Sequence, residues 1–232
     1  MTYKTVQKEL RKYASKERAE TNAWFFKTGK GQYGEGDKFI GVSNPDARKV
    51  AIKYQDLDFK EIKNLLDSKI HEDRFVGLEI LVARYEGADI KEKKKIVDFY
   101  LKNKKQVNNW DLVDTSASYI LGDYLFDKDR SILYKLAKSK TLWDRRIAVV
   151  STHFFIKQKD FKDIFALTQI LLKDKEDLMH KAIGWMLREV GKKDEKQLTK
   201  FLDTHTKVLP RTTLRYAIER LSSVERSKYM RR

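Results

Sequence analysis

Hydrophobic residues recur every three or four positions along most of the chain, which has 232 residues. This spacing is the one that places apolar side chains along one face of an α-helix. Only ten glycines and two prolines are present, so few positions favour turns or break helices. The pattern predicts an all-α fold.

The predicted helices follow one another as pairs. We expect them at residues 5–20 with 22–27, 45–54 with 59–67, 71–85 with 90–103, 110–126 with 130–138, 142–157 with 161–172, 177–190 with 195–205, and a last pair within 210–230. Asn44 before Pro45 predicts a helix start, since asparagine caps helices and proline suits the first helical position. Four of the ten glycines fall in residues 29–37, which predicts a surface loop.

The pairs repeat weakly along the chain. Arg74, Asp114, Arg146 and Lys181 occupy similar positions in successive pairs, at spacings of 40, 32 and 35 residues, which are typical of helical-hairpin repeats. One hairpin cannot bury its apolar stripe alone, but stacked hairpins can. We therefore predict HEAT-like repeats that form a curved α-solenoid with a concave groove, as a single domain over residues 1–232.

The chain is strongly basic, with 50 Lys and Arg against 34 Asp and Glu and a formal charge of +16. A high charge content is ordinary for helical surfaces, but the excess of one sign is not, and it attracts polyanions. Nucleic acid is the first expected partner, and an acidic protein on a solenoid scaffold is an alternative. Cations at the repeated positions would make the predicted groove basic and line it with phosphate contacts.

Several classes of site are excluded or disfavoured. The chain has no cysteine, which excludes disulfides, thiolate zinc sites and cysteine nucleophiles. The four histidines lack metal-ligand spacing, so we expect no metal and no other cofactor. Residues 29–37 match neither common phosphate-binding glycine motif, so we expect a structural loop there. The N-terminus has no signal-peptide core and no stretch approaches a membrane span, which favours a cytoplasmic protein, expected to be a monomer.

Tryptophans stand beside charged residues at equivalent places in the repeats. Trp110 and Asp114 are four residues apart, so they share one helix face, and Lys181, Trp185 and Arg188 line another. Large aromatics on apolar helices are more often core residues. A carboxylate in a basic groove, however, cannot help to bind phosphate, and it would suit a positively charged reaction centre instead.

These residues lie in segments that resemble a known family. The segments NNWDLVDTSASYILGDYL, LWDRRIAVVSTHFF and DLMHKAIGWMLREVGKKDEKQL are similar to the DNA alkylation repair (AlkD-like) family, and the likeness runs from about residue 23 to the C-terminus. The resemblance implies a HEAT-like solenoid that holds duplex DNA in its concave groove and removes N3- and N7-alkylated purines.

The resemblance also implies roles for single residues. The catalytic acid falls on Asp114, the two sugar-contacting tryptophans on Trp110 and Trp185, and the phosphate-contacting arginine on Arg146. Phe25 stands where the family has a tyrosine, and the loop at 29–37 has no close counterpart. The expected DNA contacts are Arg146, Lys181, Arg74, Arg188 and Phe25.

The sequence thus predicts an enzyme, a monofunctional glycosylase that hydrolyses the N-glycosidic bond of alkylated purines in double-stranded DNA. A non-catalytic HEAT-like module that binds damaged or distorted DNA is the alternative, because the same cations serve binding without turnover. Neither binding function needs a carboxylate among the cations, which favours the enzyme.

Overall fold

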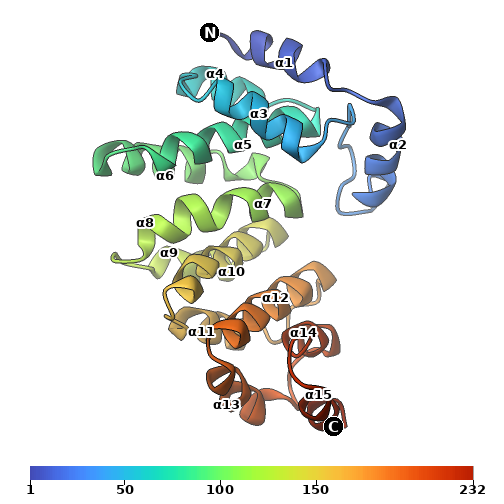
Figure 1. Cartoon of the computed structure of the whole chain (residues 1–232), viewed down its shortest axis with the longest axis vertical. Coiled ribbons are helices and arrows are strands. Elements are labelled where there is room, and N and C mark those ends of the chain that lie inside the picture. Colours follow the sequence, from blue (N-terminus) through green and yellow to red (C-terminus); the bar gives the residue numbers. More distant parts are fainter. Residues whose placement is uncertain (232) are drawn as a thin grey trace. The chain divides into compact units, whose positions relative to one another are not determined.

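The predicted all-α helical-repeat fold is confirmed. A computed structural model of the protein describes residues 1–231. Within these residues the chain is helical with connecting loops and has no β-strand, apart from one isolated bridge between Lys38 and Ile70 (Figure 1). None of the described helices is both long enough and apolar enough to cross a bilayer.

The chain forms two compact units, Met1–Ser116 and the residues from Ala117 onward. The first unit holds α1 (Tyr3–Arg11), α2 (Lys16–Phe25), α3 (Asn44–Lys53), α4 (Phe59–Leu66), α5 (His71–Glu86), α6 (Ile90–Lys102), a 3₁₀ turn (Lys104–Gln106) and most of α7 (Trp110–Ala117). The second holds a π-helical turn (Ser118–Gly122), α8 (Asp123–Leu125), α9 (Ser131–Ala137), α10 (Leu142–Lys157), α11 (Lys162–Ile170), α12 (Asp177–Lys193), α13 (Glu195–His205), α14 (Arg211–Ala217) and α15 (Ser223–Met230). That the whole chain acts as one domain stays a prediction.

The first predicted helix, 5–20, is wrong as a single element. The chain leaves the helix after Arg11 and restarts at Lys16, because Ser15 caps α2 by accepting a hydrogen bond from the Arg18 backbone N–H. The Ser15 backbone N–H is also taken, by the carbonyl of Ile40. Only α1 keeps a buried apolar face, formed by Val6 and Leu10, whereas α2 has no buried residue.

The start of α3 and a turn within the helix predicted at 110–126 also differ from the prediction. The side chain that caps α3 is Ser43 rather than Asn44, and it accepts from the Asp46 N–H at 3.3 Å. The helix predicted at 110–126 contains the π-helical turn that ends at Gly122. A Cβ at Gly122 would lie 2.4 Å from the Ser151 carbonyl oxygen, so only glycine permits this close approach of backbone to α10.

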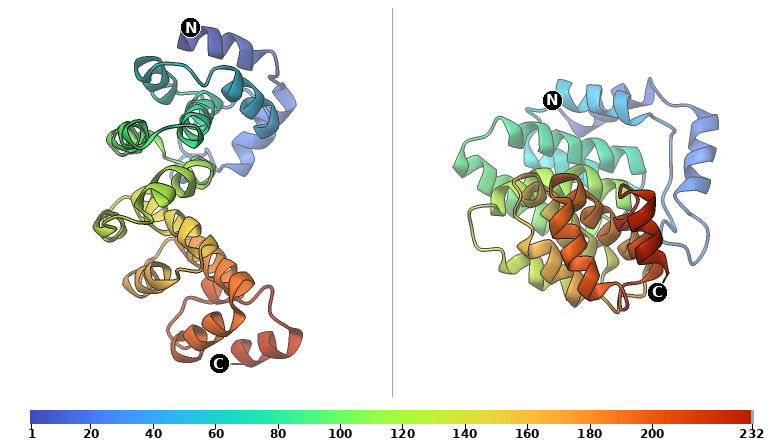
Figure 2. Two further views of the ribbon diagram at one scale, coloured as in Figure 1. Left: turned by 60° about the vertical axis from the view of Figure 1, so that its left-hand side comes forward. Right: turned by 60° about the horizontal axis from the view of Figure 1, so that its bottom comes forward.

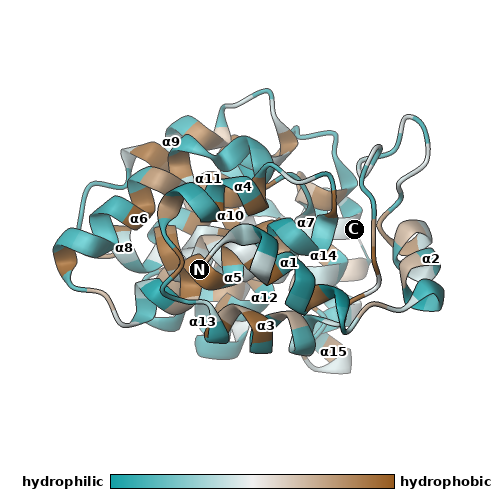
Figure 3. Ribbon diagram, turned by 90° about the horizontal axis from the view of Figure 1, so that it is seen from above, coloured by the Kyte–Doolittle hydropathy of each residue, from teal (hydrophilic) through white to brown (hydrophobic). Residues whose placement is uncertain are grey.

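Each unit has its own apolar core. In the first unit α5 is buried on nearly all sides between α3 and α4, and its Leu78, Ile80 and Leu81 are fully buried. In the second unit α10 and α12 pack together, and the core includes Ile147, Val150 and Met186. Other helices are amphipathic: hydrophobic and hydrophilic residues share a single helix, as along α6 (Figure 3).

A long connection joins α2 to α3 (Figure 2), and its residues 40–42 are held by the first turn of α5. The Glu72 carboxylate, buried there, accepts hydrogen bonds from the backbone N–H groups of Ile40, Gly41 and Val42. Gly41 has a φ of +76°, and a Cβ would lie 2.0 Å from the Ser15 carbonyl oxygen. Glycine is therefore required at this position.

Candidate functional site

Trp110 and Asp114 lie on α7, one turn apart, and both side chains are half-buried. The Asn109 side-chain oxygen accepts a hydrogen bond of 2.8 Å from the Trp110 backbone N–H. This bond satisfies an otherwise unpaired donor at the start of the helix and fixes where α7 begins. The predicted pairing of an indole and a carboxylate on one partly open helix face is therefore present.

An aromatic cluster in the first unit orients the Trp110 ring. The indole lies flat on the Phe26 ring, with centroids 4.9 Å apart and an interplanar angle of 10°. Phe25 meets Trp110 edge to face at 5.8 Å, and 52% of Phe25 is exposed. Phe25 thus lies beside Trp110, while Phe26, which the sequence analysis did not single out, covers one indole face.

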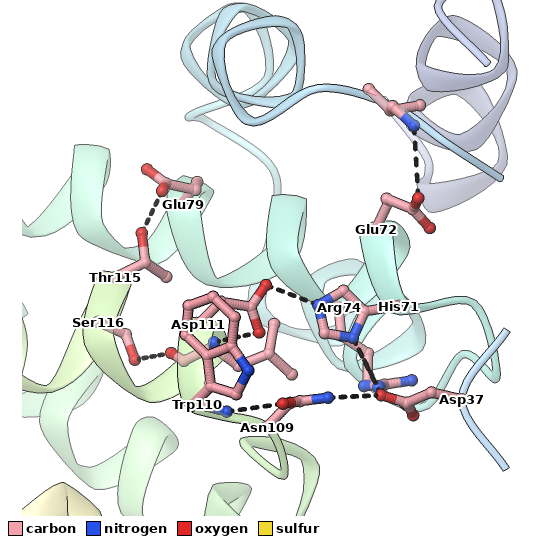
Figure 4. Close-up of polar contacts among 12 residues, drawn as sticks. Asp37, His71, Glu72, Arg74, Glu79, Asn109, Trp110, Asp111, Thr115 and Ser116 are labelled. Atoms are coloured by element: carbon pink, nitrogen blue, oxygen red, sulfur yellow. Dashed lines mark hydrogen bonds and ion pairs between the residues drawn. The ribbon is translucent and has the colours of Figure 1, made fainter. Parts of the chain in front are cut away.

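Beneath this cluster lies a buried group of charged residues, shown in Figure 4. The His71 Nδ1 is 3.0 Å from one carboxylate oxygen of Asp37, and its Nε2 is 2.7 Å from a carboxylate oxygen of Asp111. The Arg74 Nη2 donates to the other Asp37 oxygen at 2.6 Å. The Asn109 amide also donates to Asp37, at 3.2 Å.

These contacts change the proton affinity of both partners. Burial alone would lower the pKa of His71, but the charge of Asp111 and the hydrogen bonds to Asp111 and Asp37 outweigh it and raise the pKa to about 9. Burial likewise opposes the charge on Asp37, yet the contacts with His71 and Arg74 outweigh it and lower the pKa of that carboxyl group. His71 is therefore charged at neutral pH.

The predicted contact of Arg74 with DNA stays a prediction, and the burial of Arg74 argues against it. Arg74 is only 3% exposed, and its guanidinium is taken by Asp37 and by the Ser68 carbonyl oxygen. In this position the Arg74 side chain stabilises its buried neighbours and has little surface for a phosphate.

Three predicted residues of the second unit lie along α12. The Lys181 ammonium pairs with Asp177 at 2.8 Å, and 42% of the Lys181 side chain is exposed. Trp185 is half-buried one turn further on. Arg188 forms an ion pair with Glu219, which lies beyond α14, and most of its side chain is covered. Lys181 is thus open to solvent, whereas a phosphate would compete with Glu219 for Arg188.

Arg146 is buried, with 5% of its surface exposed, and its Nη1 donates to the Leu178 carbonyl oxygen at 2.8 Å. Leu178 lies in the first turn of α12, so this hydrogen bond links α10 to the start of α12. Arg146 therefore has a structural role in addition to the predicted phosphate contact, which stays a prediction.

His153, which no sequence pattern singles out, lies beside Trp185. The ring centroids of His153 and Trp185 are 5.7 Å apart, at 46°. Burial, together with the nearby charge of Lys157, lowers the pKa of His153 to about 4, so its ring is neutral at neutral pH. A cavity of about 310 Å³ adjoins it, lined also by Lys157, Glu189 and Lys192.

The remaining histidines show no metal geometry. Within residues 1–231 no group of three His, Asp or Glu side chains is arranged to hold an ion. At His71 the two ring nitrogens meet different carboxylates, so one ion cannot replace both contacts. The His180 Nε2 lies 2.6 Å from the Asp174 carbonyl oxygen, a contact within the protein.

Comparison with known proteins identifies the family. The family model described as "DNA alkylation repair enzyme" matches residues 6–221. A solved structure, described as a predicted DNA alkylation repair enzyme from Enterococcus faecalis, superimposes with a TM-score of 0.70 at 15% identity, covering 90% of this chain and 97% of that one. No protein of curated function matches the sequence significantly. The chain belongs to the DNA alkylation repair enzyme family.

Proposed function

We propose that the protein is a monofunctional DNA glycosylase that excises N3- and N7-alkylated purines from duplex DNA by hydrolysing the N-glycosidic bond. The observation that carries the proposal is the pair of Trp110 and Asp114 on one half-open face of α7, in a chain of this family. Both residue types are the ones that the family resemblance implies at these positions.

The chemistry suits so few functional groups. Alkylation at N3 or N7 leaves the purine cationic, so the base departs as a neutral molecule and needs no general acid. Positive charge then develops on the deoxyribose as an oxocarbenium ion. A fixed carboxylate stabilises that charge electrostatically, and an indole face attracts it through its π electrons.

Asp114 is the proposed catalytic residue. Its carboxylate would stabilise the sugar cation and would also orient or deprotonate the attacking water. Water adds its oxygen to C1′ as the C1′–N bond breaks, and the proton that it loses passes to the carboxylate or to solvent. The products are the free alkylated base and an abasic site.

The tryptophans are proposed to contact the sugar. One face of the Trp110 indole is covered by Phe26, so the opposite face is the one available to a deoxyribose. The family resemblance assigns a second sugar contact to Trp185. Lys181 is the best-exposed predicted phosphate contact, because its ion pair with Asp177 is a surface pair of small energy that phosphate can replace.

The decisive experiment uses duplex DNA with one N7-methylguanine. Incubation with the protein, followed by alkaline scission at abasic sites, is expected to cut the modified strand at that position only. An unmodified duplex of the same sequence is the control. Duplex binding without base release would instead support the alternative of a non-catalytic DNA-binding module. Absence of duplex binding would support the other alternative, a solenoid scaffold that binds an acidic protein.

A further inference from the structure

We propose that His71, held between Asp37 and Asp111, is a positioning residue that sets the orientation of Trp110 through two independent sets of contacts. This inference rests on the proposed function for its effect on base excision, but its structural part does not. His71 lies on α5, remote in sequence from α7, and does not belong to the predicted site.

The first set of contacts runs through the start of α7. Asp111 immediately follows Trp110, and one of its oxygens faces the His71 Nε2 at 2.7 Å while the other accepts from the Leu112 N–H. Asp111 is buried. His71 therefore fixes the first turn of α7, from which the Trp110 side chain projects (Figure 4).

The second set runs through stacked rings. The His71 ring stacks on Phe39 with centroids 4.5 Å apart, and both rings contact Phe26. Phe26 in turn lies flat on Trp110. A charged imidazole against aromatic faces adds a cation–π attraction to this column. A displaced His71 would thus disturb Phe26, and with it the surface on which the indole rests.

The charges of the cluster balance only when His71 is protonated. The cluster contains two carboxylates, Asp37 from the loop and Asp111 from α7. Among residues 1–231 the only other cation paired with either of them is Arg74, on the same helix as His71. The neighbouring acids face elsewhere: Glu72 accepts from the backbone at 40–42, and Asp73 meets α1. Without the His71 proton one buried carboxylate is left uncompensated, which is costly.

Loss of this proton should therefore move Trp110. The structure raises the pKa of His71 to about 9, so the transition falls above neutral pH. Between about pH 6 and 8 His71 keeps its proton and its contacts with Asp37 and Asp111. As pH rises through about 9, α7 and Phe26 lose their common anchor, and the environment of the Trp110 indole changes.

Fluorine NMR of the full chain labelled with 5-fluorotryptophan tests this directly, since there are only four tryptophans. Trp110→Phe assigns the Trp110 signal. In the wild type that signal is expected to shift with pH, with a midpoint near 9, while the signal of exposed Trp24 does not follow it. Asp37→Asn keeps the shape but removes one negative partner, so the midpoint should move to lower pH.

Activity is measured at pH 7.5 on the N7-methylguanine duplex. His71→Gln is expected to lower single-turnover excision about 10²-fold, the scale of a small misplacement of a reacting group, with little change in duplex affinity. The double variant His71→Gln with Asp111→Asn, which removes the uncompensated charge, should recover part of the loss. His205→Gln, which replaces a histidine stacked on Phe201 in the other unit, should change neither quantity.

The outcomes are distinct. A Trp110 signal that is independent of pH from 7 to 10, or that has the same midpoint in Asp37→Asn, would overturn the positioning role. Excision by a folded His71→Gln variant at the wild-type rate would overturn it as well. Titration of the Trp110 signal in a protein that releases no base would overturn the proposed function and leave the positioning of Trp110 supported.

Discussion

The Trp110 indole lies flat on the Phe26 ring, with centroids 4.9 Å apart and planes inclined by 10°. One face of the indole is therefore committed to the protein, and only the other can meet a ligand. The edge of Phe25 further limits how the indole can turn. This contact, between residues 84 positions apart in the sequence, gives a rigid aromatic surface beside Asp114.

Trp110→Ala is expected to reduce excision far more than affinity for undamaged duplex, because the proposed partner is a sugar cation that exists fully only in the transition state. Trp185→Ala should behave in the same way. Single-turnover excision and duplex binding are measured in parallel. Trp24→Ala is the control, since Trp24 is 72% exposed and has no assigned role. Equal losses of binding and excision would show that the tryptophans serve binding alone.

Arg74→Ala should destabilise the protein by about 3 to 5 kcal/mol, because it leaves the buried Asp37 carboxylate without one of its two charged partners. Urea unfolding gives this free energy. The salt dependence of duplex binding by the folded fraction should not change, since Arg74 is buried. A stable variant with a reduced salt slope would restore Arg74 as a phosphate contact.

Lys181→Ala should weaken duplex binding with little regard to sequence, and should lower the slope of log K against log salt by about one. The reason is that Lys181 is a partly exposed cation at a repeated position of α12. Lys196 is also exposed but lies on α13, the second helix of the same hairpin. Lys196→Ala should leave the slope unchanged, and an identical effect of both substitutions would argue against a defined phosphate contact.

The stability of the protein should fall in alkaline solution because of His71. The pKa of His71 is about 9 in the folded chain, above the value near 6.5 of an unfolded chain. The stabilisation is therefore complete below about pH 6.5 and is lost as pH rises through about 9, on the order of 3 kcal/mol in total. Urea unfolding of wild type and His71→Gln at pH 6, 8 and 10 checks this. Parallel losses in both proteins would contradict it.

The helices were predictable because each carries a local signal. Apolar periodicity placed α10 and α13 at their observed bounds, and the spacing of Trp110 and Asp114 on one helix face needed no tertiary information. The break at Ser15 was missed because its cause is partly tertiary, a hydrogen bond to the Ile40 carbonyl. Local patterns do not report such bonds.

The surroundings of the site were less predictable. Arg74 and Arg146 have the charge of phosphate contacts, but their burial depends on which partners the fold brings to them. Nothing near His71 in the sequence indicates that Asp37 and Asp111 flank it. The role of Phe26 was not predictable for the same reason, because its contact with Trp110 is tertiary.

The most direct test of the account is Asp114→Asn, which keeps the shape and hydrogen-bonding capacity of the side chain and removes its charge. Losing one preorganised group of this kind typically costs ~10²- to 10³-fold in rate. We expect single-turnover excision of N7-methylguanine to fall by that factor, while duplex affinity holds or rises, because a carboxylate repels phosphates. Equal excision rates in the wild type and Asp114→Asn would contradict the assignment of Asp114 as the catalytic residue.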